Sequence, residues 1–247
     1  MLLLRSQTIY AVNNAGTAFN RFRYDPAFQR GFEAGGRLLG EGSAVLGRYG
    51  RPVPEAPYNP ESELETAMDQ ESDLENWARK NGCWHIHPQE YYKSLGCQFY
   101  GFGGEAQVYV EGDVFVHKVC RTGQYDNLVR FFDRIVIQNT LCPQASLEVE
   151  GFGRDLQNDF VVLMKQRFFR QAHKMSEDEI SLYMRCLGFW KLVEEPYHTV
   201  RFYSDTVIAE DLHPGNIWMT GDNNVVIIDG SFKFNTPGLG LGGKFVY

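Results

Sequence analysis

Two aspartates and an asparagine near the end of the chain have the types and spacing that phosphate chemistry needs. They lie in residues 210–230, "EDLHPGNIWMTGDNNVVIIDG", where Asp211 and Asn216 flank a Pro-Gly turn and Asp229 ends an apolar run. Mg²⁺ takes hard oxygen ligands from one or two side chains and leaves its other positions to water and phosphates. We therefore expect Asn216 and Asp229 to bind Mg²⁺ and Asp211 to accept a proton from an attacking hydroxyl.

A hairpin is the element that would bring these side chains together. "NIWM" is a short apolar run, "TGDNN" consists of turn formers, and "VVIID" is rich in β-branched residues. Antiparallel pairing joins the two open ends, so it should set Asn216 beside Asp229, and the Pro-Gly turn should direct Asp211 to the same place. The alternative is a turn capped by Asp211 and a strand that merely ends at Asp229.

A glycine-rich stretch followed by a lysine lies upstream, in "GFGGEAQVYVEGDVFVHKV". The glycines that would let the backbone approach a polyanion are Gly101, Gly103 and Gly104. Val116 and Lys118 share one face of the next strand, so the ammonium lies beyond an apolar surface on which adenine could rest, with Val108 above it. The alternative is an ordinary glycine-rich hairpin with a lysine at its edge.

In this order, the two segments resemble the glycine-rich loop, catalytic loop and metal-binding loop of protein-kinase-like phosphotransferases. "DLHPGN" is closer to bacterial and small-molecule kinases than to eukaryotic ones, since Glu210 stands where an arginine is usual. The phenylalanine that normally separates the metal-binding Asp from Gly is absent between Asp229 and Gly230, and Ala106 replaces the third glycine. The resemblance implies ATP and Mg²⁺ as cofactors and transfer of the γ-phosphate to a hydroxyl.

The span from about residue 73 to 247 most closely resembles the kinase domains of polyvalent proteins from bacterial mobile elements and phages. The motifs that carry this resemblance are "EAQVY" before "VHKV", "DRIVIQN", "EGFGRD", "GFW" and "DLHPGNIW". It implies an acceptor that is an unknown protein or small molecule. It also suggests neighbouring domains in a larger parent protein.

The family normally pairs its lysine with an acid on the next helix. "QYDNLVRFFDRIVIQN", residues 124–139, has the apolar spacing of an amphipathic helix but lacks the usual glutamate. Asp126 and Asp133 lie on nearly one face, and Asp133 is the better placed partner for Lys118 because it is deeper in the helix. The alternative is an exposed pair between Asp133 and Arg130 or Arg134.

The expected fold class is α+β, a two-lobed protein-kinase-like fold with a reduced C-terminal lobe. Two strands around "RDLQN" complete an N-terminal lobe at about 73–165, and a hinge follows at 166–169. Backbone groups of that hinge, at Gln166 and Phe168, would bind the adenine edge. A minimal C-terminal lobe occupies 170–247, with a helix that begins at the Ser176 cap.

The first seventy-two residues differ in composition. They are rich in Gly, Pro and Glu with weak periodicity, which indicates a linker or an extension draped over the surface, with a hairpin around "NNAG". At the other end, seventeen residues follow Gly230, where protein kinases carry an activation segment and a peptide-docking platform. Three functions therefore remain open: phosphotransfer, nucleotide binding without turnover, and AMP transfer.

Composition excludes several other classes. The net charge of −7, without a basic stripe, argues against nucleic acid, and no apolar run is long enough to span a membrane. The five cysteines form no CxxC pair, so we expect reduced thiols and a cytoplasmic location. Cys83, His85 and His87 have zinc-ligand chemistry but no second ligand cluster near them.

Overall fold

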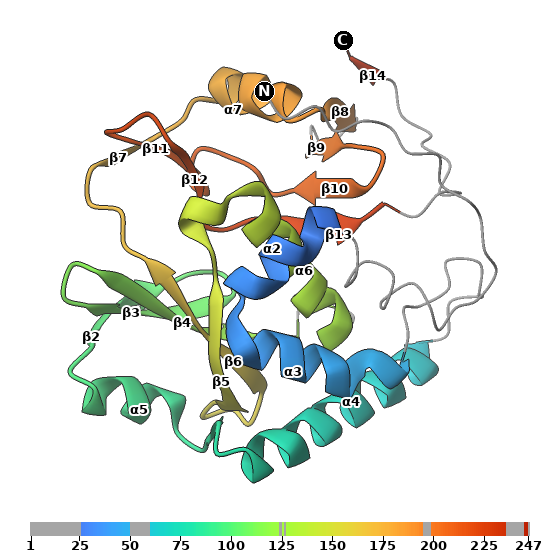
Figure 1. Ribbon diagram of the computed structural model, residues 1–247, viewed down its shortest axis with the longest axis vertical. Helices are drawn as coiled ribbons and strands as arrows, with labels where there is room; N and C mark the ends of the chain where they lie inside the picture. Colours follow the sequence, from blue (N-terminus) through green and yellow to red (C-terminus); the bar gives the residue numbers. More distant parts are fainter. Residues whose placement is uncertain are drawn as a thin grey trace.

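The structure is a computed structural model with mixed α and β elements, as the sequence predicts (Figure 1). It describes residues 26–49, 60–123, 125, 127–194, 199–235 and 245–246. Three sheets contain six, five and three strands. The largest sheet and the two smaller ones lie on either side of a central helix, α6 (Leu128–Leu141), which the N-terminal helices cover (Figure 1).

The six-stranded sheet has the order β1-β5-β6-β4-β3-β2. The strands are β1 (Trp84–His85), β2 (Gln98–Phe102), β3 (Ala106–Glu111), β4 (Phe115–Arg121), β5 (Glu148–Arg154) and β6 (Phe160–Arg167). All neighbours pair antiparallel except β1 and β5. The glycine-rich hairpin and the two strands around "RDLQN" are confirmed.

The strand register assigns the two faces of this sheet to different helices. Between β4 and β6, Lys118 pairs with Met164, Val119 with Leu163 and Cys120 with Val162. Paired residues share a face and successive residues alternate, so the Val119 pair lies on the face opposite to the other two pairs. Met164 and Cys120 belong to the core that includes α6, whereas Val119 and Leu163 pack with α5 (Pro88–Ser94) through Tyr92. Lys118 therefore points to the α6 side of the sheet.

The C-terminal half forms the two smaller sheets and one helix. The three-stranded sheet contains β7 (Ala172–Lys174), β11 (Ile217–Thr220) and β12 (Val225–Ile227). The five-stranded sheet contains β8 (Trp190–Glu194), β9 (Thr199–Tyr203), β10 (Val207–Glu210), β13 (Ser231–Phe234) and β14 (Phe245–Val246). Helix α7 (Glu177–Cys186) begins with the predicted capping box of Ser176 and Glu179. The predicted β11–β12 hairpin is confirmed.

The predicted linker or surface extension at the N-terminus is helical in the residues the structure describes. They form α2 (Pro26–Ala34), α3 (Gly36–Leu46), a 3₁₀ turn η1 (Gly47–Tyr49) and α4 (Pro60–Lys80). Leu39 on α3 and Leu74 on α4 are fully buried in the main core. The predicted boundary at residue 72 falls inside α4. The hairpin predicted around residues 13–16 lies outside the described residues.

The sequence does not show the usual apolar pattern of these helices, because glycines stand at positions where α2 and α3 contact α6. A β-carbon at Gly31 on α2 would lie 2.3 Å from the Val136 carbonyl oxygen of α6. One at Gly42 on α3 would lie 3.0 Å from the Phe132 ring. Composition therefore resembled a linker where the structure needs glycine for close helix packing.

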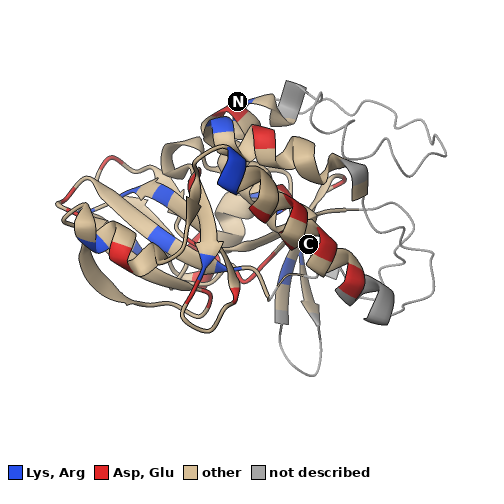
Figure 2. Ribbon diagram, turned by 90° about the horizontal axis from the view of Figure 1, so that it is seen from below, with Lys and Arg blue, Asp and Glu red and all other residues tan. Residues whose placement is uncertain are grey.

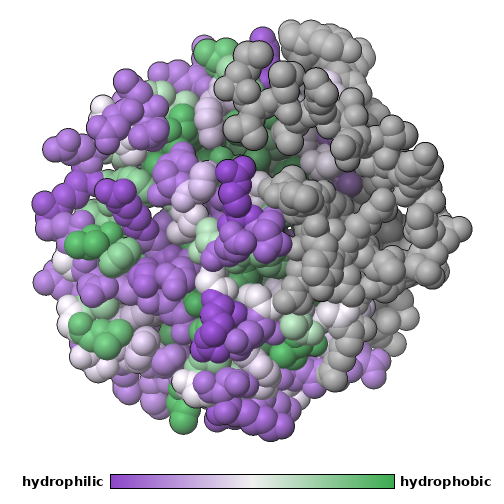
Figure 3. Space-filling model, in the orientation of Figure 1, coloured by the Kyte–Doolittle hydropathy of each residue, from purple (hydrophilic) through white to green (hydrophobic). Residues whose placement is uncertain are grey.

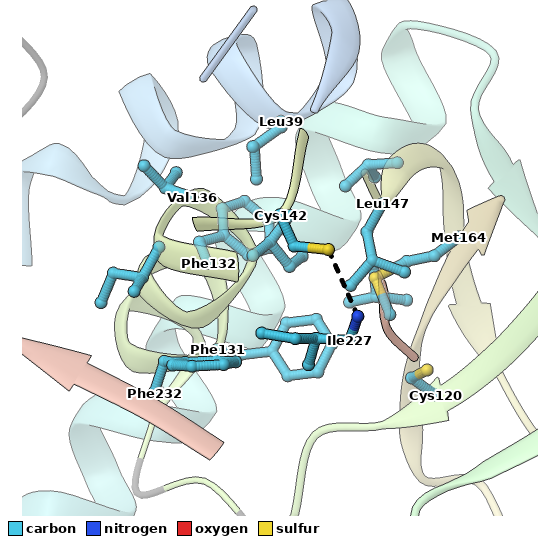
Figure 4. Packing of buried hydrophobic residues seen from close by; sticks show 14 of the residues in the cluster. Leu39, Cys120, Phe131, Phe132, Val136, Cys142, Leu147, Met164, Ile227 and Phe232 are labelled. Atoms are coloured by element: carbon cyan, nitrogen blue, oxygen red, sulfur yellow. Dashed lines mark hydrogen bonds between the residues drawn. The ribbon is translucent and has the colours of Figure 1, made fainter. Parts of the chain in front are cut away.

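One continuous core connects the sheets through α6. Figure 4 shows Met164 and Cys120 from the large sheet, Phe131 and Phe132 from α6, and Ile227 and Phe232 from the C-terminal strands around the same centre. The Cys142 thiol, whose pKa burial raises to about 11, accepts a hydrogen bond from the Ile227 main-chain N–H at 3.2 Å. This packing fixes β12, and with it the residues that follow it.

One face of the described residues is mainly polar. On the face in Figure 3, hydrophilic residues predominate and apolar ones form small separate patches. Lysine and arginine lie among aspartate and glutamate rather than along one stripe in the view of Figure 2. None of the helices in the described part of the chain has the length and apolar character to cross a membrane.

Candidate active site

Lys118 lies at the junction between the large sheet and the C-terminal strands. It is held in β4 opposite Val108 of β3 on one side and Met164 of β6 on the other. Its Nζ donates a hydrogen bond to the main-chain oxygen of Ile228 at 2.5 Å. Burial lowers the pKa of Lys118, although the Asp229 carboxylate acts in the opposite direction. The ammonium is thus next to the predicted metal-binding segment.

The glycine-rich turn joins β2 and β3 on the same sheet. The Gly103 N–H donates to the Ala106 oxygen at 2.7 Å and closes the turn. A β-carbon at Gly101 or Gly104 would meet nothing within 4 Å, and one at Gly103 would meet only the Ala106 oxygen at 3.7 Å. The packing of the described residues does not require glycine at these positions, so the turn leaves space for an external group.

Asp229 follows β12 and is held by one of its two carboxylate oxygens. Its Oδ1 accepts hydrogen bonds from the buried Arg134 side chain of α6 and from the Gly230 N–H at 3.1 Å. The side chain retains 40% exposure, and within the described residues no hydrogen bond ends on Oδ2. Gly230 is required by packing, because a β-carbon there would lie 2.8 Å from the Phe232 ring.

Asp211 and Asn216 lie together after β10. The Asn216 amide nitrogen donates to the Asp211 main-chain oxygen at 2.9 Å and to Oδ2 at 3.0 Å. Both partners are acceptors, so the amide oxygen of Asn216 must point elsewhere. Asp211 adopts a left-handed backbone with φ of 58°, which is uncommon for a residue other than glycine and occurs at functional sites.

The hairpin register differs by one position from the expected pairing of Asn216 with Asp229. Ile217 pairs with Ile227, and the Ile228 N–H donates to the Asn216 oxygen at 2.9 Å, so Ile228 lies across from Asn216. The prediction assumed that the ladder ends at Asp229, whereas β12 ends at Ile227. The side chain of Asn216 contacts Asp211, and within the described residues no hydrogen bond joins it to Asp229.

Asp133 is the predicted partner of Lys118. Asp133 is buried on α6, and the titratable groups with the largest effect on the pKa of Lys118 are Asp229, Cys120, Arg134 and Glu105. Asp126, the other acid considered on that helix, lies outside the described residues. The role of Asp133 stays a prediction.

Residues 166–169 begin within a strand, because β6 continues to Arg167. Gln166 pairs with Val116 in the ladder, and its buried side chain donates to the Ala145 oxygen at 2.7 Å. The Phe168 N–H donates to the Val114 oxygen at 2.9 Å. The Phe168 N–H therefore already has an intramolecular partner, and adenine binding by this segment stays a prediction.

Arg134 and Glu105 lie at the candidate site, although the sequence does not single them out. Arg134 was considered only as an exposed partner of Asp133, yet its side chain is 4% exposed. Glu105 lies in the glycine-rich turn, 3.7 Å from Arg134, and accepts a hydrogen bond from Tyr125 at 2.9 Å. The available signal was the position of Arg134 between Phe131 and Ile135 on the apolar side of the helix.

A cavity of about 360 Å³ lies beside the glycine-rich turn rather than at Lys118. Its walls include Gly104, Arg121, Arg154 and Glu71. Arg121 pairs with Asp155 at 2.7 Å and Arg154 pairs with Glu71 at 3.4 Å, so these charges already compensate one another. Among the described residues, no group of three or more His, Cys, Asp or Glu side chains could hold a metal ion by itself.

Comparison with known proteins identifies the family of the chain. Residues 67–236, more than half of the chain, match the family model described as a serine/threonine/tyrosine kinase found in polyvalent proteins. No curated protein and no solved structure matches the chain. The matched span contains the glycine-rich turn, Lys118, Asp211 and Asp229. The chain therefore belongs to the kinase family of polyvalent proteins.

Proposed function

We propose that the chain is an ATP- and Mg²⁺-dependent phosphotransferase that moves the γ-phosphate to a hydroxyl of a protein or small molecule. The observation that carries the proposal is the hydrogen bond from Lys118 to the Ile228 oxygen. It brings the cation of the glycine-rich sheet next to Asp229, which the family resemblance makes a metal ligand. Phosphoryl transfer depends mainly on such positioning and on charge stabilisation.

The chain offers groups for each part of a nucleotide. Val108 and Val116 present apolar surface on the α6 side of the sheet, suited to the base. The open space at Gly101, Gly103 and Gly104 suits the phosphates, whose negative charge Lys118 would balance. Asp211, with 60% of its side chain exposed, would accept the proton of the attacking hydroxyl.

The oxygen donors fit Mg²⁺. Asp229 has an exposed carboxylate with Oδ1 anchored, and Asn216 has its amide oxygen turned away from Asp211. These hard oxygen donors would hold the ion together with phosphate oxygens and water. When bound, Mg²⁺ neutralises charge on the phosphates.

The two-lobed arrangement forms part of the same proposal. The six-stranded sheet with α6 would be the nucleotide-binding lobe, and α7 with the two smaller sheets would be a reduced second lobe. The segment after β6 would be the hinge. The acceptor, a larger parent protein and a cytoplasmic location stay predictions from the sequence.

Labelled ATP tests the proposal directly. The chain should be incubated with Mg²⁺ and ATP labelled on the γ-phosphate, and in parallel with ATP labelled on the α-phosphate. We expect γ label on the protein or in released phosphate, lost when Mg²⁺ is chelated. Label from the α-phosphate on the protein would instead mean AMP transfer. No label from either, together with nucleotide binding in a calorimeter, would mean a binding module and would contradict the proposal.

A further inference from the structure

Arg134 connects three segments at the candidate active site. It extends from α6, its Nε donates to the Gly230 oxygen at 2.7 Å, and its Nη2 donates to Asp229 Oδ1. Its Nη1 lies 3.7 Å from the Glu105 carboxylate in the glycine-rich turn. A fork of donors in fixed geometry suits this task, because guanidinium can bind a carboxylate and a carbonyl together.

The side chain is enclosed rather than displayed at the surface. It is 4% exposed, and its guanidinium lies 5.5 Å from the Tyr125 ring centre and 6.0 Å from that of Phe131. Nη1 is buried without a hydrogen-bond partner among the described residues. Burying a cation costs free energy, and pairing with neighbouring groups offsets that cost. For Arg134 these neighbours are the Gly230 oxygen and the Asp229 carboxylate.

Lys118 and Asp229 make their contacts with other groups rather than with each other. Lys118 donates to the Ile228 oxygen, and Asp229 accepts from Arg134, so no ion pair within 4.0 Å joins Lys118 and Asp229 in the described structure. Without the guanidinium, Asp229 would be free to turn toward the ammonium. Both groups would then leave the positions that the proposed chemistry needs.

We infer that Arg134 is a positioning residue that orients Asp229 for Mg²⁺ and links it to the glycine-rich turn through Glu105. The inference rests on the proposed function, since it assigns the metal to Asp229. Arg134 engages Oδ1, and no hydrogen bond among the described residues ends on Oδ2 of this 40% exposed side chain, so Arg134 supports the ligand rather than occupying the metal position. Groups that hold a metal-ligating side chain in this way contribute about 10- to 100-fold to metal affinity.

Binding measurements test this inference without relying on turnover. ATP is held at a fixed concentration, Mg²⁺ is titrated, and calorimetry and thermal shift report binding for the full chain. We expect Arg134→Met to raise the half-saturating Mg²⁺ concentration about 10- to 100-fold, with a smaller change in binding of metal-free ATP. Arg134→Lys should recover part of the loss, because one ammonium cannot replace both donors of the fork.

Two further variants keep the result interpretable. Glu105→Gln changes a residue at the turn surface and should raise the half-saturating Mg²⁺ concentration in the same direction, by a smaller factor. Arg130→Met, on the same helix, should leave it unchanged and serves as the control. If Arg134→Met folds poorly, Arg134→Lys and Glu105→Gln carry the test.

Different results would overturn different statements. An unchanged Mg²⁺ requirement in the Arg134 and Glu105 variants, with lower melting temperatures, would make Arg134 structural only. A lower requirement would mean that it competes with the metal. If the unsubstituted chain shows no Mg²⁺-dependent binding, the proposed function fails, and the inference fails with it.

Discussion

Lys118 and Ile228 are 110 positions apart in the chain and are joined by a hydrogen bond of 2.5 Å. Because the acceptor is a main-chain oxygen, the contact depends on the path of the backbone rather than on the Ile228 side chain. It sets the distance between the glycine-rich sheet and the loop that carries Asp229.

Replacing Lys118 with methionine should abolish γ-phosphate transfer. Methionine fills similar volume but cannot neutralise phosphate charge, and loss of one stabilising donor at a transition state lowers a rate about 100- to 1,000-fold. Transfer of γ label measures this loss. Lys165→Met is the matched control, because Lys165 lies on the opposite face of the sheet and pairs with Glu148 at 3.2 Å. Equal activity of the Lys118 variant and the unsubstituted chain would contradict the assignment.

Asp211→Asn and Asp229→Asn should separate proton acceptance from metal binding. The Asp211 variant keeps an oxygen for the Asn216 amide but loses the base, so transfer should fall about 100-fold or more while nucleotide binding persists. The Asp229 variant should raise the half-saturating Mg²⁺ concentration at least about 10-fold. Calorimetry and label transfer distinguish the two effects. Asp222→Asn, in the exposed turn of the same hairpin, should change neither, and full transfer by both test variants would rule out these roles.

The buried His117 should make stability depend on pH. Its Nδ1 lies 2.7 Å from Glu150 and its Nε2 lies 3.1 Å from Glu111, so both nitrogens can donate to a carboxylate when the ring is protonated. Burial alone would lower the pKa of His117, but these carboxylates outweigh it and raise that pKa. Burial would raise the pKa of Glu150, but His117, Tyr92 and Lys165 together lower it.

The direction of each pKa shift sets the pH range over which that group stabilises the fold. The raised pKa of His117 stabilises the fold below about pH 6.5, and this contribution is lost as the pH rises through the folded-state value. The lowered pKa of Glu150 stabilises the fold above about pH 4.5, and this contribution is lost at lower pH. Glu150→Gln should therefore reduce the free energy of unfolding most near pH 5.5, by about 1 to 3 kcal/mol, and less near pH 9.

Urea denaturation at the two pH values measures this difference. Glu148→Gln is the control, since Glu148 is exposed on the same strand and should change stability little at either pH. A loss in the Glu150 variant that is the same at both pH values would show that the charged pair does not form.

Leu39→Ala should show that the N-terminal helices belong to the core. Leu39 is fully buried on α3, and removing its side chain leaves a cavity that should lower the free energy of unfolding by about 2 to 5 kcal/mol. Leu182→Ala on α7, where the leucine is 62% exposed, should have a small effect. Chemical denaturation of the full chain compares them, and equal losses would contradict the packing.

The sequence predicts elements whose pattern is local. The glycine-rich hairpin, the β11–β12 hairpin and the capping box at Ser176 depend on neighbouring residues, and the structure confirms them. The placement of Lys118 on the α6 side follows from strand alternation. The sequence does not predict helices α2 and α3, because their contacts with α6 depend on glycines whose packing partners are distant in the sequence.

The candidate site also contains residues that the sequence predicts and one that it does not. Motif and spacing predict Lys118, Asp211, Asn216 and Asp229 as site residues, and these roles stay predictions. The register of Asn216 was one position off, because the end of a ladder depends on tertiary packing at Gly230. Arg134 was missed because only the folded chain shows that a cation on α6 meets a carboxylate beyond β12.

Contacts from several distant parts of the chain hold α6 in place. Its first N–H is capped by the Gln70 side chain of α4 at 3.0 Å, Gln138 donates to the Ile227 oxygen at 3.0 Å, and Gly31 lies against its middle. An outward rigid-body displacement of α6 would break these contacts at both ends and along its length at once. The helix is thus built as a fixed support, because moving it would cost all of these contacts together.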